Sequence, residues 1–158
     1  MNQKPSKYLK YVNNIMFILA TILVIGGFYK SYKADKIYNK DVSSIIQENH
    51  GQYLNSVIEE TDDSEIKAKL IDIKYSLFCG RGDSVDVVIN KDGEIEIDTY
   101  IKSGNLKLLI LDKYQNSIFF EEVNNKKIDV NVKAGKYEII PVGSWFSGKV
   151  SIKIPHGE

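Results

Sequence analysis

The sequence is poor in the residues from which disulfides, metal centres and catalytic triads are built. Its 158 residues contain one cysteine and two histidines. A single thiol, Cys79, excludes an intrachain disulfide framework and a metal site of several cysteines. His50 and His156 have no metal-ligand spacing and lie in no recognisable nucleophile motif. We therefore expect no metal, no cofactor, no catalytic residue and a buried, unreactive Cys79.

A net charge is also absent. Lysine and arginine together number 21, as do aspartate and glutamate, so the formal net charge is zero. There is thus no general basic field to attract nucleic acid. No glycine-rich loop joins a strand to a helix in the way that phosphate-binding loops do. Because catalytic groups can also assemble from distant residues, an unrecognised hydrolase stays open as the less favoured class.

Charge is missing altogether from residues 11–29, which lie between Lys10 and Lys30. A helix of this length rises about 28 Å, close to the roughly 30 Å of a bilayer's hydrocarbon core. Its Val, Ile, Leu and Phe residues favour insertion by roughly 3 to 6 kcal/mol, and tyrosines at both ends suit the membrane interfaces. We predict a transmembrane anchor over residues 11–30 that contacts the lipid bilayer, after a basic tail of residues 1–10.

The same stretch would also suit a cleaved signal peptide. The nearest cleavage point, after Ala34, has Tyr32 where a small residue is needed, which favours an uncleaved anchor. Lysines flank the span on both sides, so their count does not favour a C-terminal part outside the cytoplasm. We expect that side nevertheless, from the composition of the C-terminal part.

Residues 31–65 show a helical period. The apolar positions recur at steps of three and four, with polar residues between them: Tyr38, Val42, Ile45, Ile46, then Tyr53, Leu54, Val57 and Ile58. Asn39 is expected to cap the first piece and Gly51 to end it. This pattern predicts a helical juxtamembrane stalk. Because the stripe is too short for a coiled coil, packing against the following domain is favoured over binding a partner helix.

From about residue 66 the period falls to two. Apolar and polar residues alternate in segments such as 85–89, 95–101 and 128–132, and turn residues arrive about every ten positions, for example at Ser103-Gly104-Asn105. The run LKLLILD at 106–112 is apolar on both faces, as in a central strand. Seven or eight short strands predict a mainly β fold, an antiparallel β-sandwich, over residues 66–158.

Two segments of this region resemble known proteins. They are SGNLKLLILDKYQNSIFFEE at 103–122 and KKIDVNVKAGKYEIIPVGSWFSGKVSIKI at 126–154. Both are similar to the C-terminal β-sandwich of small membrane-anchored proteins from Gram-positive bacteria, and more loosely to pre-peptidase C-terminal jelly-roll domains. The likeness is carried by Gly104, the AGKY step at 134–137 and the strand start at 148–150. It implies a cell-envelope location and no particular activity.

Trp145 and Phe146 stand out as a large aromatic pair in a predicted loop between Gly143 and Gly148. Exposed together, they would form a stacking platform for a sugar or an apolar partner. We favour the alternative that one or both rings close the open end of the sandwich, because a large exposed apolar area is usually avoided. They are the only residues for which we predict a possible ligand or partner contact.

Other motifs have simpler interpretations. The tripeptide Arg81-Gly82-Asp83 matches an integrin-binding sequence but is expected to be an ordinary turn. The calcium-loop frame around residues 90–94 fails, because it would place its first ligand at Val88. The acidic row of Glu94, Glu96 and Asp98 could hold a cation, but is more typical of the solvated face of a half-buried sheet.

Three functions agree with these observations. The first is a non-enzymatic, membrane-tethered β-sandwich that binds an envelope protein or glycan, or assists assembly. The second is an accessory or sensory subunit that acts through its anchor or stalk. The third is an unrecognised hydrolase. The absence of catalytic motifs favours the first.

Overall fold

The computed structural model describes residues 7–48, 51, 55–63 and 68–155, which form a helical N-terminal part followed by a β domain. Helix α1 (Lys7–Asp35) leads directly into the 3-10 helix η1 (Lys36–Asn39), and the short helix α2 (Val42–Gln47) follows. The strands are β1 (Asn55–Asp63), β2 (Ala68–Arg81), β3 (Val85–Ile89), β4 (Gly93–Asp112), β5 (Ser117–Glu122), β6 (Lys127–Val132) and β7 (Gly135–Pro155).

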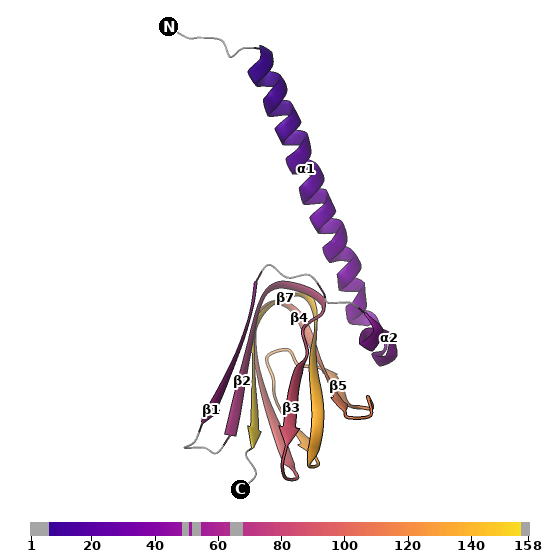
Figure 1. Cartoon of the computed structure of the whole chain (residues 1–158), viewed down its shortest axis with the longest axis vertical. Coiled ribbons are helices and arrows are strands. Elements are labelled where there is room, and N and C mark those ends of the chain that lie inside the picture. Colours follow the sequence, from indigo (N-terminus) through magenta and orange to yellow (C-terminus); the bar gives the residue numbers. More distant parts are fainter. Residues whose placement is uncertain (1–6, 49–50, 52–54, 64–67, 156–158) are drawn as a thin grey trace.

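Two long strands, β4 and β7, build both layers of the β domain. They pair antiparallel along most of their length, and both bend halfway. On one side of the bend the sheet order is β1-β2-β7-β4-β6, and on the other it is β3-β7-β4-β5. Figure 1 shows the strands folding over at the end of the domain next to α1. The predicted antiparallel β-sandwich is therefore confirmed.

Apolar side chains fill the interior between the layers. The buried ones come from β2, β3, β4, β6 and β7 and from Val123, and none of the described ones comes from β1 or β5. The central run at 106–112 contributes side chains to two hydrophobic clusters, one inside the sandwich and one on its outer surface, as its two apolar faces predicted. Leu108 and Ile110 point into the sandwich, whereas Leu109 and Leu111 point to its outer surface. There they pack against Ile45 of α2 and the buried residues of η1. The interpretation of this helical segment as a packing element is confirmed.

The predicted stalk over 31–65 is wrong in its second half. Asn55–Asp63 is a strand, β1, which pairs with β2 along its whole length. Tyr53 and Leu54 of the predicted second helix lie outside the described residues. The cap is also different, because the Asp41 carboxylate, not Asn39, accepts the backbone N–H of Ser44.

Two predicted turns are bends within strands. The chain does not reverse at Ser103-Gly104-Asn105 but continues in β4, and residues 143–148 likewise belong to β7. The pairing of β4 with β7 continues through these points with shifts in register. Because β4 and β7 each join segments that were expected to be separate strands, the domain has fewer strands from residue 66 onward than the pattern suggested. β1 adds one strand before residue 66, so the total of seven agrees with the expected seven or eight.

Helix α1 is longer than the predicted anchor of 11–30 and extends to Asp35. By length and composition it could cross a membrane, and its most apolar stretch is not buried against the rest of the chain. Phe17 and Leu23, for example, are 74% and 77% exposed. Figure 1 shows α1 standing clear of the sandwich over most of its length.

Candidate functional site

The bent end of the sandwich separates the two rings of the predicted aromatic pair. Phe146 is fully buried and lies opposite Phe78 in the pairing of β2 with β7. Tyr75 stacks on Phe78 with ring centroids 4.4 Å apart and meets Phe146 edge-on at 6.4 Å. Phe146 thus closes this end of the core, as favoured above, and the pair forms no two-ring platform. Trp145 is only partly buried and is available for a contact.

Local backbone geometry produces this separation. Leu77 and Trp145 both have positive φ, 48° and 50°, at neighbouring points of β2 and β7. A left-handed residue disrupts the alternation of a strand, so Leu77 and Trp145 stay outside while the next residues, Phe78 and Phe146, turn inward. The Leu77 N–H donates to Ser147 Oγ at 2.9 Å, which ties the two bends together.

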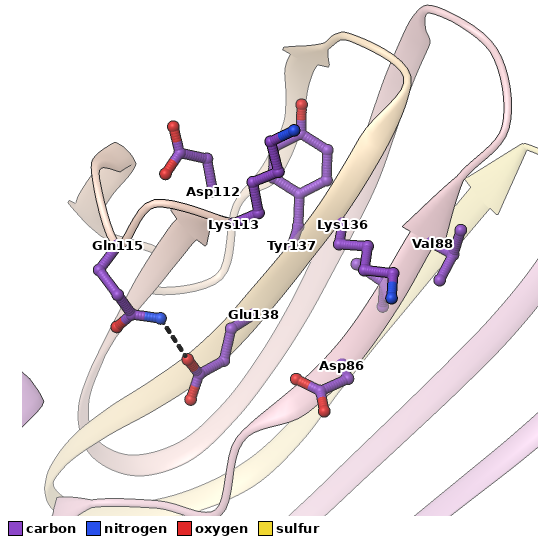
Figure 2. Close-up of a pocket in the computed structure, with 9 residues that line it drawn as sticks. Asp86, Val88, Asp112, Lys113, Gln115, Lys136, Tyr137 and Glu138 are labelled. Atoms are coloured by element: carbon purple, nitrogen blue, oxygen red, sulfur yellow. Dashed lines mark hydrogen bonds between the residues drawn. The ribbon is translucent and has the colours of Figure 1, made fainter.

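A groove of about 370 Å³ lies on the outer surface, where β3 and β7 meet the turn that follows β4. Its walls carry acids and lysines in nearly equal number, as Figure 2 shows: Asp86, Asp112, Glu138, Lys113 and Lys136. This volume is at the lower end of the range of small-molecule sites, whose linings are mainly apolar. The groove could hold a small polar molecule, but two of its three acids already have structural roles.

Each of two groove carboxylates is held by its neighbours. The Asp112 carboxylate accepts the side-chain amide of Asn116 and the backbone N–H groups of Asn116 and Tyr114, at 2.8 to 3.0 Å. These bonds lower the pKa of Asp112 and fix the turn. Glu138 pairs with Arg81 Nη2 at 3.4 Å and accepts a bond from Gln115 (Figure 2). Two of the three acids of the groove, Asp112 and Glu138, therefore have structural roles.

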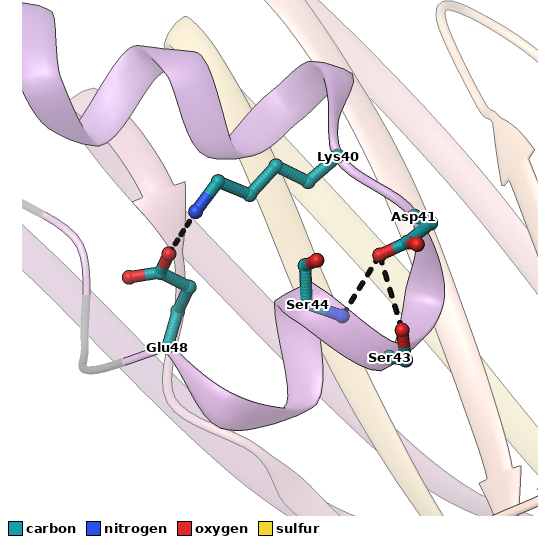
Figure 3. Close-up of polar contacts among 5 residues, drawn as sticks. All are labelled: Lys40, Asp41, Ser43, Ser44 and Glu48. Carbon is teal, nitrogen blue, oxygen red and sulfur yellow. Dashed lines mark hydrogen bonds and ion pairs between the residues drawn. The ribbon is translucent and has the colours of Figure 1, made fainter.

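The junction between α1 and the sandwich is a third distinct region. The Asp41 carboxylate caps α2 through Ser44 and also accepts Ser43 Oγ, while Lys40 and Glu48 form an ion pair across the helix (Figure 3). The hydrogen bonds to Ser44, with those to Ser43, lower the pKa of Asp41. These contacts stabilise the short helical segment 40–48 internally.

Further bonds fasten this segment to the sheet. Tyr38 donates its hydroxyl to Glu122 at 2.8 Å, and Lys107 Nζ donates to the Tyr38 carbonyl at 3.0 Å. The Lys107 ammonium also lies 4.4 Å from the centre of the Tyr38 ring. Since η1 follows α1 without a break, α1 and the sandwich are joined by a packed connection rather than a free linker.

The remaining motifs have structural roles. Arg81-Gly82-Asp83 was expected to be a turn, but the chain keeps its direction there, because β2 and β3 both pair antiparallel with β7. The Gly82 N–H donates to the Pro141 carbonyl of β7 at 2.8 Å. Glu96 of the acidic row pairs with Lys153 at 2.8 Å and Lys127 at 3.3 Å, as on a solvated sheet face.

Cys79 is fully buried, as expected, and its burial raises the pKa of the thiol. Within the ranges that the structure describes, no group of three or more His, Cys, Asp or Glu side chains could hold a metal ion. His50 and His156 lie outside those ranges.

No family model and no curated protein matches this sequence. Among solved structures, the cupin domain of an XRE-family transcriptional regulator from Enterobacter cloacae is 16% identical, with a TM-score of 0.38 over 65% of this chain and 97% of that chain. A cupin domain from Bordetella pertussis Tohama I is 12% identical, with a TM-score of 0.38 over 65% of this chain and 96% of that one.

The Yersinia pseudotuberculosis-derived mitogen is 10% identical, with a TM-score of 0.38 over 65% of this chain and 90% of that one. At these identities and TM-scores, the similarities assign neither a ligand nor an activity to this chain. The resemblance of residues 103–154 to anchored Gram-positive proteins stays a prediction. What the structure itself establishes is an antiparallel β-sandwich with an N-terminal apolar helix.

Proposed function

We propose that this protein is a single-pass membrane protein whose β-sandwich lies outside the cytoplasm and acts in binding or assembly at the cell envelope. The observation that carries this proposal is α1, whose apolar stretch is left uncovered by the chain. Exposing so many large apolar side chains to water is unfavourable, whereas a bilayer would cover them. The anchor then fixes where the sandwich works.

A role in binding is supported by how the polar groups are used. The interior between the two layers is filled by apolar side chains. Two of the three acids of the outer groove, Asp112 and Glu138, hold a turn and an ion pair. A rigid sandwich that presents its surface and its edge strands at a membrane is suited to recognising an envelope protein or a glycan.

A role as a subunit of a membrane complex is the second candidate. Because η1 and α2 pack on the sheet, their apolar residues are not free for a partner helix. A subunit of this kind would act through α1, whose uncovered surface could contact neighbouring helices as well as lipid. Loss of a membrane complex after replacement of α1 by an unrelated apolar helix would favour this second function.

The location can be tested with the full chain in bacterial cells. We expect the protein to stay in the membrane fraction after an alkaline carbonate wash; release by the wash would contradict the anchor. A Tyr114→Cys variant adds a thiol at a side chain that is 71% exposed. Its labelling by a membrane-impermeant maleimide in intact cells would support an extracytoplasmic sandwich, and labelling only after permeabilisation would contradict it. The unsubstituted chain is the control, since its one thiol, Cys79, is buried.

A further inference from the structure

The bent end of the sandwich lies beside the last turn of α1. Gly80 of β2 is so close to the helix that an added methyl group would come within 3.1 Å of the Ala34 carbonyl oxygen. Cys79, next to Gly80, is within hydrogen-bond reach of the Trp145 backbone. Burial raises the pKa of its thiol, and the charge of Asp35 raises it further. Figure 1 shows the bends of β2 and β7 on the side of the sandwich from which α1 rises.

This arrangement sets the distance of the bent end from a bilayer that α1 spans. Lys30 marks the end of the apolar run, and Ala34 follows four residues later. Four residues of helix rise about 6 Å. The headgroup region on each side of the hydrocarbon core is about 5 to 8 Å thick. The part of the sandwich that touches Ala34 therefore lies at the depth of the lipid headgroups.

The side chains exposed at this end suit that environment. Leu77 is 46% exposed and Tyr100, just before the bend of β4, is 69% exposed. Trp145 is partly exposed and Lys102 is exposed. Tryptophan and tyrosine are enriched at membrane interfaces, and a lysine can reach lipid phosphates. We call Leu77, Tyr100, Lys102 and Trp145 the apical patch.

Backbone strain gives a second, independent reason to assign the apical patch a role. A positive φ is unfavourable for large side chains such as those of Leu77 and Trp145. Glycine would relieve it, and strained residues of this kind concentrate at functional sites. The strain keeps a leucine and a tryptophan outside the core at the bends of two paired strands, which the bond from Leu77 N–H to Ser147 joins.

We infer that the apical patch is a second membrane contact, which rests in the headgroup region of the same bilayer that α1 spans. The inference rests on the proposed function, because it needs an inserted α1. The helix would then hold the sandwich at the membrane, while Leu77 and Trp145 limit its tilt. The outer surfaces of the layers that η1 and α2 leave uncovered would stay turned toward other partners.

Fluorescence tests this directly, because Trp145 is the only tryptophan of the chain. The full-length protein is reconstituted into vesicles of phosphatidylcholine and phosphatidylglycerol, with and without bromine on the acyl chains. We expect brominated lipid to lower the Trp145 emission about twofold, since an interfacial ring contacts the upper acyl chains. Leu77→Asp should remove most of this quenching and Lys102→Glu part of it. Val88→Asp, at an exposed site on β3, should leave it unchanged.

Flotation of the vesicles and circular dichroism separate the possible outcomes. Protein that fails to float with the vesicles would overturn the proposed function and this inference with it. Protein that floats and is folded, but whose Trp145 emission is not quenched, would overturn the inference alone. Equal quenching in the native chain and in folded Leu77→Asp and Lys102→Glu variants would also overturn it, because the patch would then not make the contact.

Discussion

A single glycine allows β4 and β7 to lie close together at the bend. Gly104 has a φ of +73°, and an added Cβ would collide with the Trp145 carbonyl of the neighbouring strand. We expect Gly104→Ala to lower the free energy of unfolding by about 1 to 3 kcal/mol through backbone strain, and by more if β7 is displaced. Gly135→Ala is the control, because its new methyl group would meet its first neighbour only at 3.6 Å. Urea unfolding of both variants in detergent, followed by Trp145 fluorescence, provides the comparison; equal losses would contradict this account.

Single carboxylates give stability a predictable dependence on pH. Hydrogen bonds from Lys153 and then Lys127 lower the pKa of Glu96. Because its pKa is lower in the folded chain than in the unfolded one, its contribution is complete above about pH 5 and is lost as the pH falls from there through the folded value. Glu96→Gln should therefore flatten the loss of stability below about pH 5 and lower stability at pH 7. Glu94→Gln, at an exposed position on the same strand, is the control. An unchanged acid slope in Glu96→Gln would contradict the assigned ion pairs.

At the scale of elements, α2 matters because it covers the outer face of the central strands. Ile45 is fully buried there against Leu109, Leu111 and Ile140. We expect Ile45→Ala to cost about 2 to 5 kcal/mol of unfolding free energy, through lost burial and the cavity left behind. Val88→Ala removes similar atoms from a side chain that is 60% exposed, and should cost less than about 0.5 kcal/mol. Comparable urea midpoints for the two variants would show that α2 is not packed on the sheet.

The elements that the sequence predicts well are those whose signal is local. The uncharged run that forms α1 and the two-faced run at 106–112 both follow from hydropathy alone. β1 could not be found in this way, because its residues Val57 and Ile58 also fit a helical spacing. They become a strand through pairing with β2 and through ion pairs such as Lys74 with Glu59, which join distant parts of the chain.

The bends were missed for the same reason. Ser103-Gly104-Asn105 has the composition of a turn, and only the continued pairing of β4 with β7 shows that the chain keeps its direction. The aromatic pair was expected in a loop but lies within β7, and which ring is buried depends on the positive φ of Trp145. No sequence pattern predicts that a tryptophan will adopt a positive φ.

At the scale of the whole molecule, the main feature is the packed connection between α1 and the sandwich. η1 begins at the residue after α1 ends, and its Ile37 and Tyr38 are buried against the sheet. A sandwich on a free linker could take any orientation above the membrane. Here the direction of α1 sets the orientation of the bent end, so the distance between Lys30 and Ala34 should control what that end can contact.

Lengthening α1 tests this coupling. Seven helix-forming residues inserted between Lys33 and Ala34 add about 10 Å of rise and turn the helix through almost two full turns, so the sandwich keeps nearly the same direction. We expect the variant to float with vesicles and to keep its β-sheet circular dichroism, while quenching of Trp145 by brominated lipid is lost. The same residues inserted before α1, after Asn2, leave the sandwich at its original height and should leave the quenching intact. Because both insertions lengthen the chain equally, only a fixed height of the bent end above the bilayer explains a difference between them, and equal quenching would mean that the connection bends freely.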